Sequence, residues 1–349
     1  MSASSPKYAP FTILSTSYKS VDDHAIQVHT LIPKLLLANI TPAAATSLTA
    51  AESSKPTPRP ILVKFHGGFL VTGDALYDDW FPQWLVDYAL QHTAVVVLPN
   101  YRLLPESTGR EIMADVHDFW TWLRDDFPRY LHGRLLQAGA GVEVDLTKVL
   151  VAGESAGGYL SVQSALGSSG GLATACIATY PVLDVASPFY TEEYEKVILG
   201  APTLPKDVLG EHIRMLKKEE EEKSGKKTVV SSATPPDRLP FALSIVQQGL
   251  YRKLLGEDKI LYPLERIEDV DGRDVPPILI IHGREDSAVP VEGSEKWLER
   301  AREKFGEAKV ELVVQPGEHG FDTDPSVTLE TPWLKDGLGR ITEAWLGGK

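Results

Sequence analysis

The sequence predicts an α/β protein with a mainly parallel central sheet, flanked by helices and carrying a helical cap insertion. Short and almost continuously apolar runs occur at 61–65, 94–99 and 149–152, as is typical of buried parallel strands. Segments with helical spacing of apolar residues lie between these runs. Repeated alternation of strand and helix implies right-handed crossovers and a sheet covered on both faces.

The alternation stops in one long segment, 185–276, and then resumes. Helical patterns at 206–217 and 242–255 fall inside this segment. Because the chain leaves the sheet and returns to it, we expect a core formed by 1–184 and 277–349, with 185–276 as a cap or lid. The cap should lie over the carboxyl ends of the strands, where ligands of open α/β sheets bind.

The remaining elements complete this core. An antiparallel pair joined by a polar turn is expected at 11–18 and 24–31, and the Ala-, Thr-, Ser- and Pro-rich stretch 41–60 is expected to be an exposed connection. Helices are predicted at 77–91, 111–126, directly after the strand at 149–152, at 294–305 and at 333–345, and further strands at 173–180, 277–282 and 310–314.

Charge and cysteine content exclude several classes of protein. The 349 residues carry a formal net charge of -13, which argues against binding to nucleic acid or to an anionic membrane. A single cysteine, Cys176, excludes an internal disulfide framework, and its apolar surroundings favour a buried side chain. The sequence has no signal-peptide pattern and no apolar run of membrane-spanning length. A soluble, cytoplasmic protein is therefore expected, with the charge run 217–223 as a solvated helix or loop.

The most informative stretch is 149–160, where four apolar residues lead into Gly-Glu-Ser-Ala-Gly and a helical pattern follows. A strand, a sharp turn and a helix would lift the hydroxyl of Ser155 clear of the sheet, and Gly153 and Gly157 would leave room for a strained backbone. This is the context in which G-x-S-x-G forms a nucleophile elbow. The alternative is that Ser155 is an ordinary helix N-cap.

A serine nucleophile needs a base, and that base needs an orienting acid, in the order Ser, Asp or Glu, His along the chain. Asp286 follows the strand at 277–282 and is the predicted acid; it could instead cap the helix that Pro290 opens, and Glu285 is a rival. His319 lies in a glycine-flanked loop after the last strand and is the predicted general base. His282 is expected to form only local hydrogen bonds.

An oxyanion also has to be stabilised, and fixed backbone amides do this well. One amide is expected from Ala156 and the others from Gly68 and Phe69, in the loop that begins with His66 and Gly67 after the strand at 61–65. The sequence contains no H-E-x-x-H, paired-cysteine or P-loop motif, so neither a metal site nor a nucleotide-binding loop is expected.

Taken together, these motifs resemble the hormone-sensitive-lipase-like (α/β-hydrolase fold-3) branch of the α/β-hydrolase superfamily. The resemblance rests on His66-Gly67-Gly68, Tyr101 to Glu106, Gly153 to Gly158, Asp286 in His282-Gly283-Arg284-Glu285-Asp286, and His319-Gly320-Phe321. It implies hydrolysis of small-molecule carboxylic esters, usually with short or medium acyl chains, without a metal or organic cofactor. It also implies a structural role for 101–106, where the residues alone indicate only a strand end with a candidate buried arginine.

Two departures from the family pattern bear on function. Phe69 stands where many members have a third glycine, and its side chain would narrow the acyl or leaving-group pocket. Kynurenine-formamidase-like hydrolases carry an aromatic residue at the comparable position, so amides remain alternative substrates. Glu154 replaces the more frequent aspartate before the nucleophile, and we expect an indirect effect there.

Several alternatives remain open at this point. An amidase, lactonase or thioesterase would use the same triad, and a small-molecule receptor that lost catalysis would keep the fold. Oligomeric state is left open. The aromatics of the insertion are expected to pack within it rather than to line a pocket; they are Phe189, Tyr190, Tyr194, Phe241 and Tyr251.

Overall fold

The computed structural model describes residues 5–37, 57–137, 141–222, 225, 227–235 and 237–347. Most of the predicted connection 41–60, namely 41–56, lies outside the described residues. Among the described residues, no helix is both long enough and apolar enough to cross a membrane.

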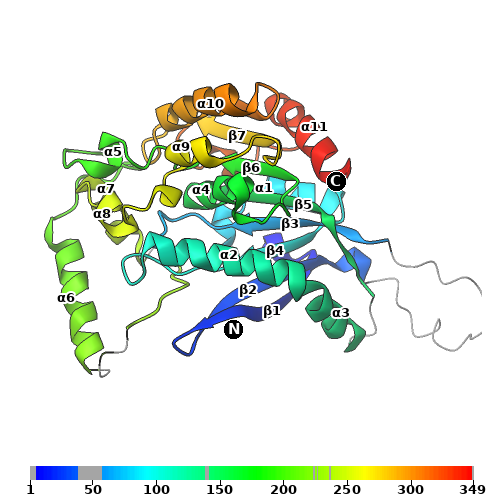
Figure 1. The fold of residues 1–349 in the computed structure, drawn as a ribbon, viewed down its shortest axis with the longest axis horizontal. Coiled ribbons are helices and arrows are strands. Elements are labelled where there is room, and N and C mark those ends of the chain that lie inside the picture. The colour runs from blue at the N-terminus through cyan, green and yellow to red at the C-terminus, as the bar shows by residue number, and fades with distance from the viewer. Residues whose placement is uncertain are drawn as a thin grey trace, which may run out of the picture.

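The described strands form one eight-stranded sheet in the order β1-β2-β4-β3-β5-β6-β7-β8 (Figure 1). Antiparallel pairing joins β1 to β2 and β2 to β4, and every later pairing is parallel. This confirms the predicted mainly parallel sheet and its N-terminal hairpin. The strands are β1 Phe11–Val21, β2 His24–Pro33, β3 Arg59–Phe65, β4 Val95–Pro99, β5 Val144–Glu154, β6 Ala175–Thr179, β7 Ile278–Gly283 and β8 Val310–Gln315.

Helices cover both faces of this sheet. The α-helices are α1 Gln83–Gln91, α2 Gly109–Asp125, α3 Phe127–Gln137, α4 Ala156–Gln163, α5 Pro188–Thr191, α6 Asp207–Glu222, α7 Leu239–Gln247, α8 Tyr251–Leu255, α9 Pro263–Arg266, α10 Val291–Phe305 and α11 Pro332–Gly347. Short 3-10 helices lie at Pro6–Tyr8, Lys34–Leu36, Asp78–Trp80, Lys259–Leu261, Ile267–Asp269 and Phe321–Thr323, and a π-helical turn at Ser164–Ser168.

The alternation of side chains along each strand assigns the two faces. In β3, Ile61 and Val63 belong to one buried cluster, which also contains apolar side chains of α2, α4 and α10. Leu62, between them, belongs to a second cluster with apolar side chains of α1 and α11. Because successive strand residues point to opposite faces, a strand buried on both sides is apolar throughout. This explains the continuous apolar runs in the sequence.

Two predicted helices are interrupted for local reasons. The segment 77–91 forms a 3-10 turn at Asp78–Trp80 and then α1, because the residue before Pro82 is kept extended. The segment 242–255 is divided into α7 and α8 at Gly249, which has a φ of +67°. A Cβ at Gly249 would lie 2.4 Å from the backbone carbon of Glu192, so only glycine fits there.

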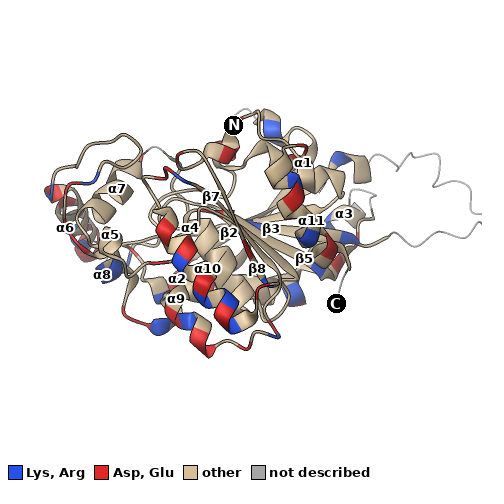
Figure 2. Cartoon of the chain, turned by 90° about the horizontal axis from the view of Figure 1, so that it is seen from above, with Lys and Arg blue, Asp and Glu red and all other residues tan. Residues whose placement is uncertain are grey.

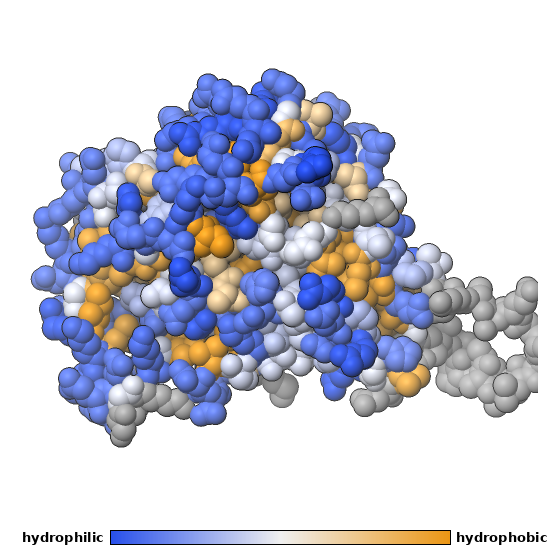
Figure 3. Space-filling view, in the orientation of Figure 1, coloured by the Kyte–Doolittle hydropathy of each residue, from blue (hydrophilic) through white to orange (hydrophobic). Residues whose placement is uncertain are grey.

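The 185–276 segment contributes α5 to α9, and α5 to α8 gather at one end of the molecule (Figure 1). Helix α6 contains most of the charge run 217–223, and its side chains there are largely exposed, as expected for a solvated helix. Figure 2 shows charges of both signs interspersed on the outer helices, for example on α10. Hydrophilic side chains dominate the face in Figure 3, with smaller hydrophobic patches between them.

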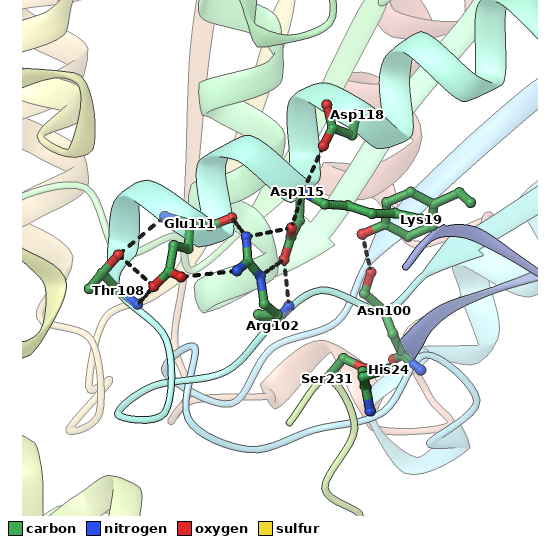
Figure 4. Close-up of polar contacts among 10 residues, drawn as sticks. Lys19, His24, Asn100, Arg102, Thr108, Glu111, Asp115, Asp118 and Ser231 are labelled. Atoms are coloured by element: carbon green, nitrogen blue, oxygen red, sulfur yellow. Dashed lines mark hydrogen bonds and ion pairs between the residues drawn. The ribbon is translucent and has the colours of Figure 1, made fainter. Parts of the chain in front are cut away.

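A buried charge network attaches α2 to the loop after β4 (Figure 4). Arg102 donates to both carboxylate oxygens of Asp115, from Nε at 2.8 Å and from Nη2 at 2.9 Å. Asp115 also accepts from the backbone N–H of Arg102 and from Lys19. A capping box between Thr108 and Glu111 begins the same helix. The arginine that the sequence marked as a candidate for burial is buried, and it pairs with Asp115 and, through Nη1, with Glu111.

Replacement of Asp115 tests this network. Asp115→Ala would leave the Arg102 guanidinium without its main counter-charge, so the free energy of unfolding should fall by about 3–5 kcal/mol. Asp118→Ala is the matched control, because Asp118 pairs with the same Lys19 but its side chain is half exposed. Its loss should cost at most about 1 kcal/mol. Urea denaturation measures both, and equal losses for the two variants would contradict the interpretation.

Candidate active site

The end of β5 holds Ser155 in the sharp turn that the sequence predicts. Ser155 has φ 55° and ψ -117°, a strained conformation for a residue with a side chain, and α4 begins at the next residue. A Cβ at Gly153 would lie 2.3 Å from the carbonyl oxygen of Gly157, and one at Gly157 would lie 2.2 Å from that of Phe65. Both glycines are therefore required by close backbone approach, and together they allow the turn.

Asp286 and His319 come from the loops after β7 and β8 and meet at the same sheet edge. Asp286 Oδ2 lies 2.7 Å from Nδ1 of His319. The other oxygen, Oδ1, accepts from the backbone N–H groups of Ala288 and Val289. Asp286 thus fixes its own loop with one oxygen and the histidine ring with the other. The helix α10 begins after Pro290, so Asp286 is not its N-cap.

The environment of Asp286 favours the ionised carboxylate. Burial by itself would raise the pKa of Asp286, but the charge of His319 and hydrogen bonds from His282, His319 and Val289 hold this pKa well below its usual range. His282 is otherwise bonded locally, to Ser294 Oγ and to the carbonyl of Val289.

Two glutamates connect the loop that carries Asp286 (the acid loop) to the loop that carries His319 (the base loop). Glu285 accepts from the N–H of Gly317, at 2.6 Å, whereas the carboxylate that contacts the His319 ring is that of Asp286. Glu318 accepts from the N–H of Ser287 at 2.6 Å and from that of His319 at 2.7 Å. The rival acid Glu285 therefore contacts backbone in this structure, and the two loops are joined by these hydrogen bonds in addition to the Asp286–His319 contact.

Ser155 and His319 line one cavity of about 220 Å³ at this edge. Its lining is mainly apolar or small, and it contains residues from the core and from the 185–276 segment. The lining residues are Gly67, Gly68, Phe69, Asp79, Trp80, Glu154, Ser155, Tyr180, Leu199, Leu239, His319, Gly320 and Thr323.

The loop after β3 contributes Gly67, Gly68 and Phe69 to the lining of this cavity. Gly68 and Phe69 both have positive φ, 98° and 55°, and neither N–H makes a hydrogen bond within the described residues. The N–H of Ala156 is the first in α4, where no intrahelical partner exists. Phe69 is almost fully buried, and its carbonyl accepts from the Tyr251 hydroxyl of the 185–276 segment.

Glu154 ties the same loop to the elbow. Its Oε1 accepts from the N–H of Gly67 at 2.8 Å, and its Oε2 lies 2.7 Å from Nζ of Lys64. Burial raises the pKa of the Glu154 carboxyl, and the charge of Lys64 opposes this shift. The sequence predicted an indirect effect of Glu154. The hydrogen bond to Gly67 is a contact through which such an effect would act.

His66 also stabilises the loop after β3. Its ring stacks on Tyr101 with centroids 4.4 Å apart, and the Tyr101 hydroxyl donates to the His66 carbonyl. Burial lowers the pKa of His66 to about 4, so the ring is neutral near pH 7. Its Nδ1 lies 2.9 Å from the carbonyl of Gly67 and donates to it, since a carbonyl only accepts.

Two residues of this site escaped the sequence analysis. Tyr180, directly after β6, has φ 37° and places its ring 4.3 Å from that of His319. Its hydroxyl donates to Asp322, which is buried and also accepts from Trp84 Nε1. The position of Tyr180 directly after a predicted strand could have marked it as a residue of the site. The involvement of Asp322 depends on a contact across the sheet edge that no spacing reveals.

The aromatics of the 185–276 segment do not line the cavity. Tyr190, Phe241 and Tyr251 are buried in packing, and Tyr194 is about half exposed. Leu199 and Leu239 are the residues that this segment contributes to the cavity wall. In the described part of the chain, no group of three or more His, Cys, Asp or Glu side chains could hold a metal ion.

Comparison with known proteins identifies the class. A sequence model of the family described as alpha/beta hydrolase fold matches residues 62–322. The chain therefore belongs to the α/β-hydrolase fold family, and the predicted resemblance to its hormone-sensitive-lipase-like branch is confirmed.

Individual proteins agree with this class. The chain is 31% identical over 345 residues to the probable carboxylesterase M8 of a Phoma species, covering 97% of this chain and 98% of that protein. Esterase 2 of Thermogutta terrifontis, solved phosphoramylated by tabun, has a similar fold, with a TM-score of 0.57, 19% identity and coverage of 99% and 98%. Carboxyl esterase 2 of Tuber melanosporum gives a TM-score of 0.55 at 17% identity, covering 97% and 86%.

The Lys64–Glu154 pair gives a prediction about stability. Glu154→Gln keeps an acceptor for Gly67 but leaves the buried Lys64 ammonium unpaired, so the free energy of unfolding should fall by about 3 kcal/mol. Adding Lys64→Met removes the unpaired charge and should restore most of that loss. Urea denaturation of the single and double variants measures the difference. A double variant no more stable than Glu154→Gln would contradict the role of the pair.

Proposed function

We propose that this carboxylesterase-type hydrolase cleaves carboxylic esters of small molecules, with short or medium acyl chains, through an acyl-enzyme on Ser155. The observation that carries the proposal is the 2.7 Å contact between Asp286 Oδ2 and His319 Nδ1, in a histidine that shares a cavity with Ser155. Membership of the family and the similarity to a probable carboxylesterase support the reaction class.

Asp286 and His319 act together to activate the serine. The carboxylate accepts the Nδ1 proton, which leaves Nε2 with its lone pair free to take the proton of Ser155 Oγ. The serine oxygen then attacks the ester carbonyl carbon. The ionised Asp286 stabilises the imidazolium that forms. The hydrogen bonds between the two loops keep the His319 ring in place.

The negative charge on the former carbonyl oxygen is stabilised by the N–H groups of Gly68, Phe69 and Ala156. These amides are fixed dipoles, so little reorganisation accompanies the reaction, and losing one such donor typically costs about 3 kcal/mol. Glu154 acts through Gly67 to keep the loop against the elbow.

Collapse of the tetrahedral intermediate breaks the ester bond, and His319 gives its proton to the leaving alcohol oxygen. Water, deprotonated by His319, then attacks the acyl-enzyme and releases the acid and free Ser155. No metal or organic cofactor takes part in this scheme. Amides, lactones and thioesters are chemically accessible to the same groups, whereas a receptor without catalysis would turn over none of them.

Replacing the nucleophile tests the scheme. Ser155→Ala should reduce kcat on p-nitrophenyl butyrate about 10⁶-fold and abolish covalent labelling by a fluorescent organophosphonate. Labelling is read by gel fluorescence and by the mass of the Ser155 peptide. A Ser155→Ala protein that is still labelled at another serine would overturn the assignment. Tight ligand binding without turnover of any ester by the unmodified protein would favour the receptor.

The assignment of Asp286 as the acid can be tested against Glu285. Asp286→Asn should lower kcat by about 10⁴-fold, because the amide no longer stabilises the imidazolium or fixes the ring tautomer. Glu285→Gln is the matched control, since the amide oxygen still accepts from Gly317 and activity should stay close to that of the unmodified protein. Steady-state kinetics on p-nitrophenyl esters measures both. The reverse ranking would make Glu285 the acid.

A further inference from the structure

A tight turn in the 185–276 segment places Leu199 at the wall of the active-site cavity. Ile198 and Ala201 exchange backbone hydrogen bonds, at 3.2 and 2.9 Å, and Leu199 and Gly200 form the tip. Leu199 lines the cavity that contains Ser155 and His319. Its N–H donates to the hydroxyl of Ser287, directly after Asp286, at 2.9 Å. The turn is thus attached to the acid loop.

Leu199 is an unfavourable residue for this position on two counts. Its φ is 52° and that of Gly200 is 73°, and turns with positive φ at both central residues favour Asn, Asp or Gly at the first of them. Its side chain is also 40% exposed, although it is large and apolar. Strained residues of this kind cluster at active sites and at segments that contact ligands. Neither turn geometry nor packing explains a leucine here, whereas contact with an apolar substrate group does.

The surroundings indicate which part of the substrate Leu199 meets. Leu199, Leu239, Trp80 and Phe69 give the 220 Å³ cavity apolar walls, which suit an alkyl chain. A second hollow of about 560 Å³ is adjacent and shares His319, Gly320 and Thr323 with the first. The leaving oxygen must lie near the imidazole that protonates it. The leaving group therefore has room in the larger hollow next to His319. The 220 Å³ cavity (the inner cavity) remains for the acyl chain.

We propose that Leu199 is a specificity-determining residue, which limits the length of the acyl chain that the inner cavity accepts. This inference rests on the proposed ester hydrolysis at Ser155. The bond between Leu199 N–H and Ser287 fixes the height of the turn over the cavity, and the leucine side chain closes the space into which a longer chain would extend.

The test uses two replacements in the full chain, Leu199→Ala and Leu199→Asn. Asparagine accepts positive φ readily, so this variant keeps the turn while removing the apolar side chain. Values of kcat/KM are measured for p-nitrophenyl acetate, butyrate, hexanoate and octanoate. Both variants should raise the octanoate-to-acetate ratio by about tenfold or more, a typical discrimination for a few methylenes. Leu199→Asn should have an unchanged or higher Tm.

Val197→Ala is the matched control, because Val197 lies two residues earlier, is 59% exposed and does not line the cavity. Its octanoate-to-acetate ratio should equal that of the unmodified protein. An unchanged ratio in both Leu199 variants, with esters still hydrolysed, would overturn the role of Leu199 alone. A change seen only when the alcohol of an acetate ester is varied would overturn the acyl assignment. Failure of the unmodified protein to hydrolyse any of the esters would overturn the proposed function, and this inference with it.

Discussion

The close approach of three backbones at the elbow is the constraint on which the rest of this site depends. The carbonyl of Phe65 at the end of β3 lies where a Cβ of Gly157 would be, and the carbonyl of Gly157 lies where a Cβ of Gly153 would be. This packing lets Ser155 keep its strained conformation. It also brings the loop after β3 against the elbow, because a Cβ at Gly67 would lie 3.4 Å from that of Ser155. Gly67, which precedes Gly68 and Phe69 in that loop, therefore packs directly against Ser155.

Buried charges then fix the loops that the sheet alone would leave free. Taking a charge out of water costs several kcal/mol unless it is paired and hydrogen-bonded, so each buried charge restricts its surroundings to an arrangement that pairs it. Lys64 and Glu154 do this between β3 and the elbow, with Gly67 as the third member. Arg102 and Asp115 do it between the loop after β4 and α2. The same logic applies to Asp286, which is buried and satisfied by backbone N–H groups and by His319.

The 185–276 segment reaches the site through few residues. Tyr251 bonds the carbonyl of Phe69, and Leu199 and Leu239 line the cavity. Phe69 itself is held between the core and this segment, with its ring edge-on to that of Tyr251. The departure from the family's third glycine is thus accompanied by a supporting contact from the inserted segment. The shape of the cavity is set jointly by the core and by this segment.

The sequence by itself determined the parts of this protein that depend on local pattern and chain order. The continuous apolar strands predicted the parallel sheet, and the positions of Ser155, Asp286 and His319 after three parallel strands (β5, β7 and β8) predicted that they would lie at one edge, because parallel strands end together. The glycine-rich loop at 66–68 was found in the same way. Breaks such as those at Pro82 and Gly249 were readable in principle, since each has a local cause.

Only the tertiary structure decided the contacts between segments far apart in the chain. The hydrogen bond from the N–H of Gly67 to Glu154 spans 87 residues, and that from the Tyr180 hydroxyl to Asp322 spans 142. No periodicity encodes such pairs, because each depends on how two loops from different strands happen to face each other. The same is true of Leu199, whose place at the cavity follows from a turn attached to Ser287 across 88 residues. Local sequence therefore specified the candidate reactive groups, and long-range packing specified what surrounds them.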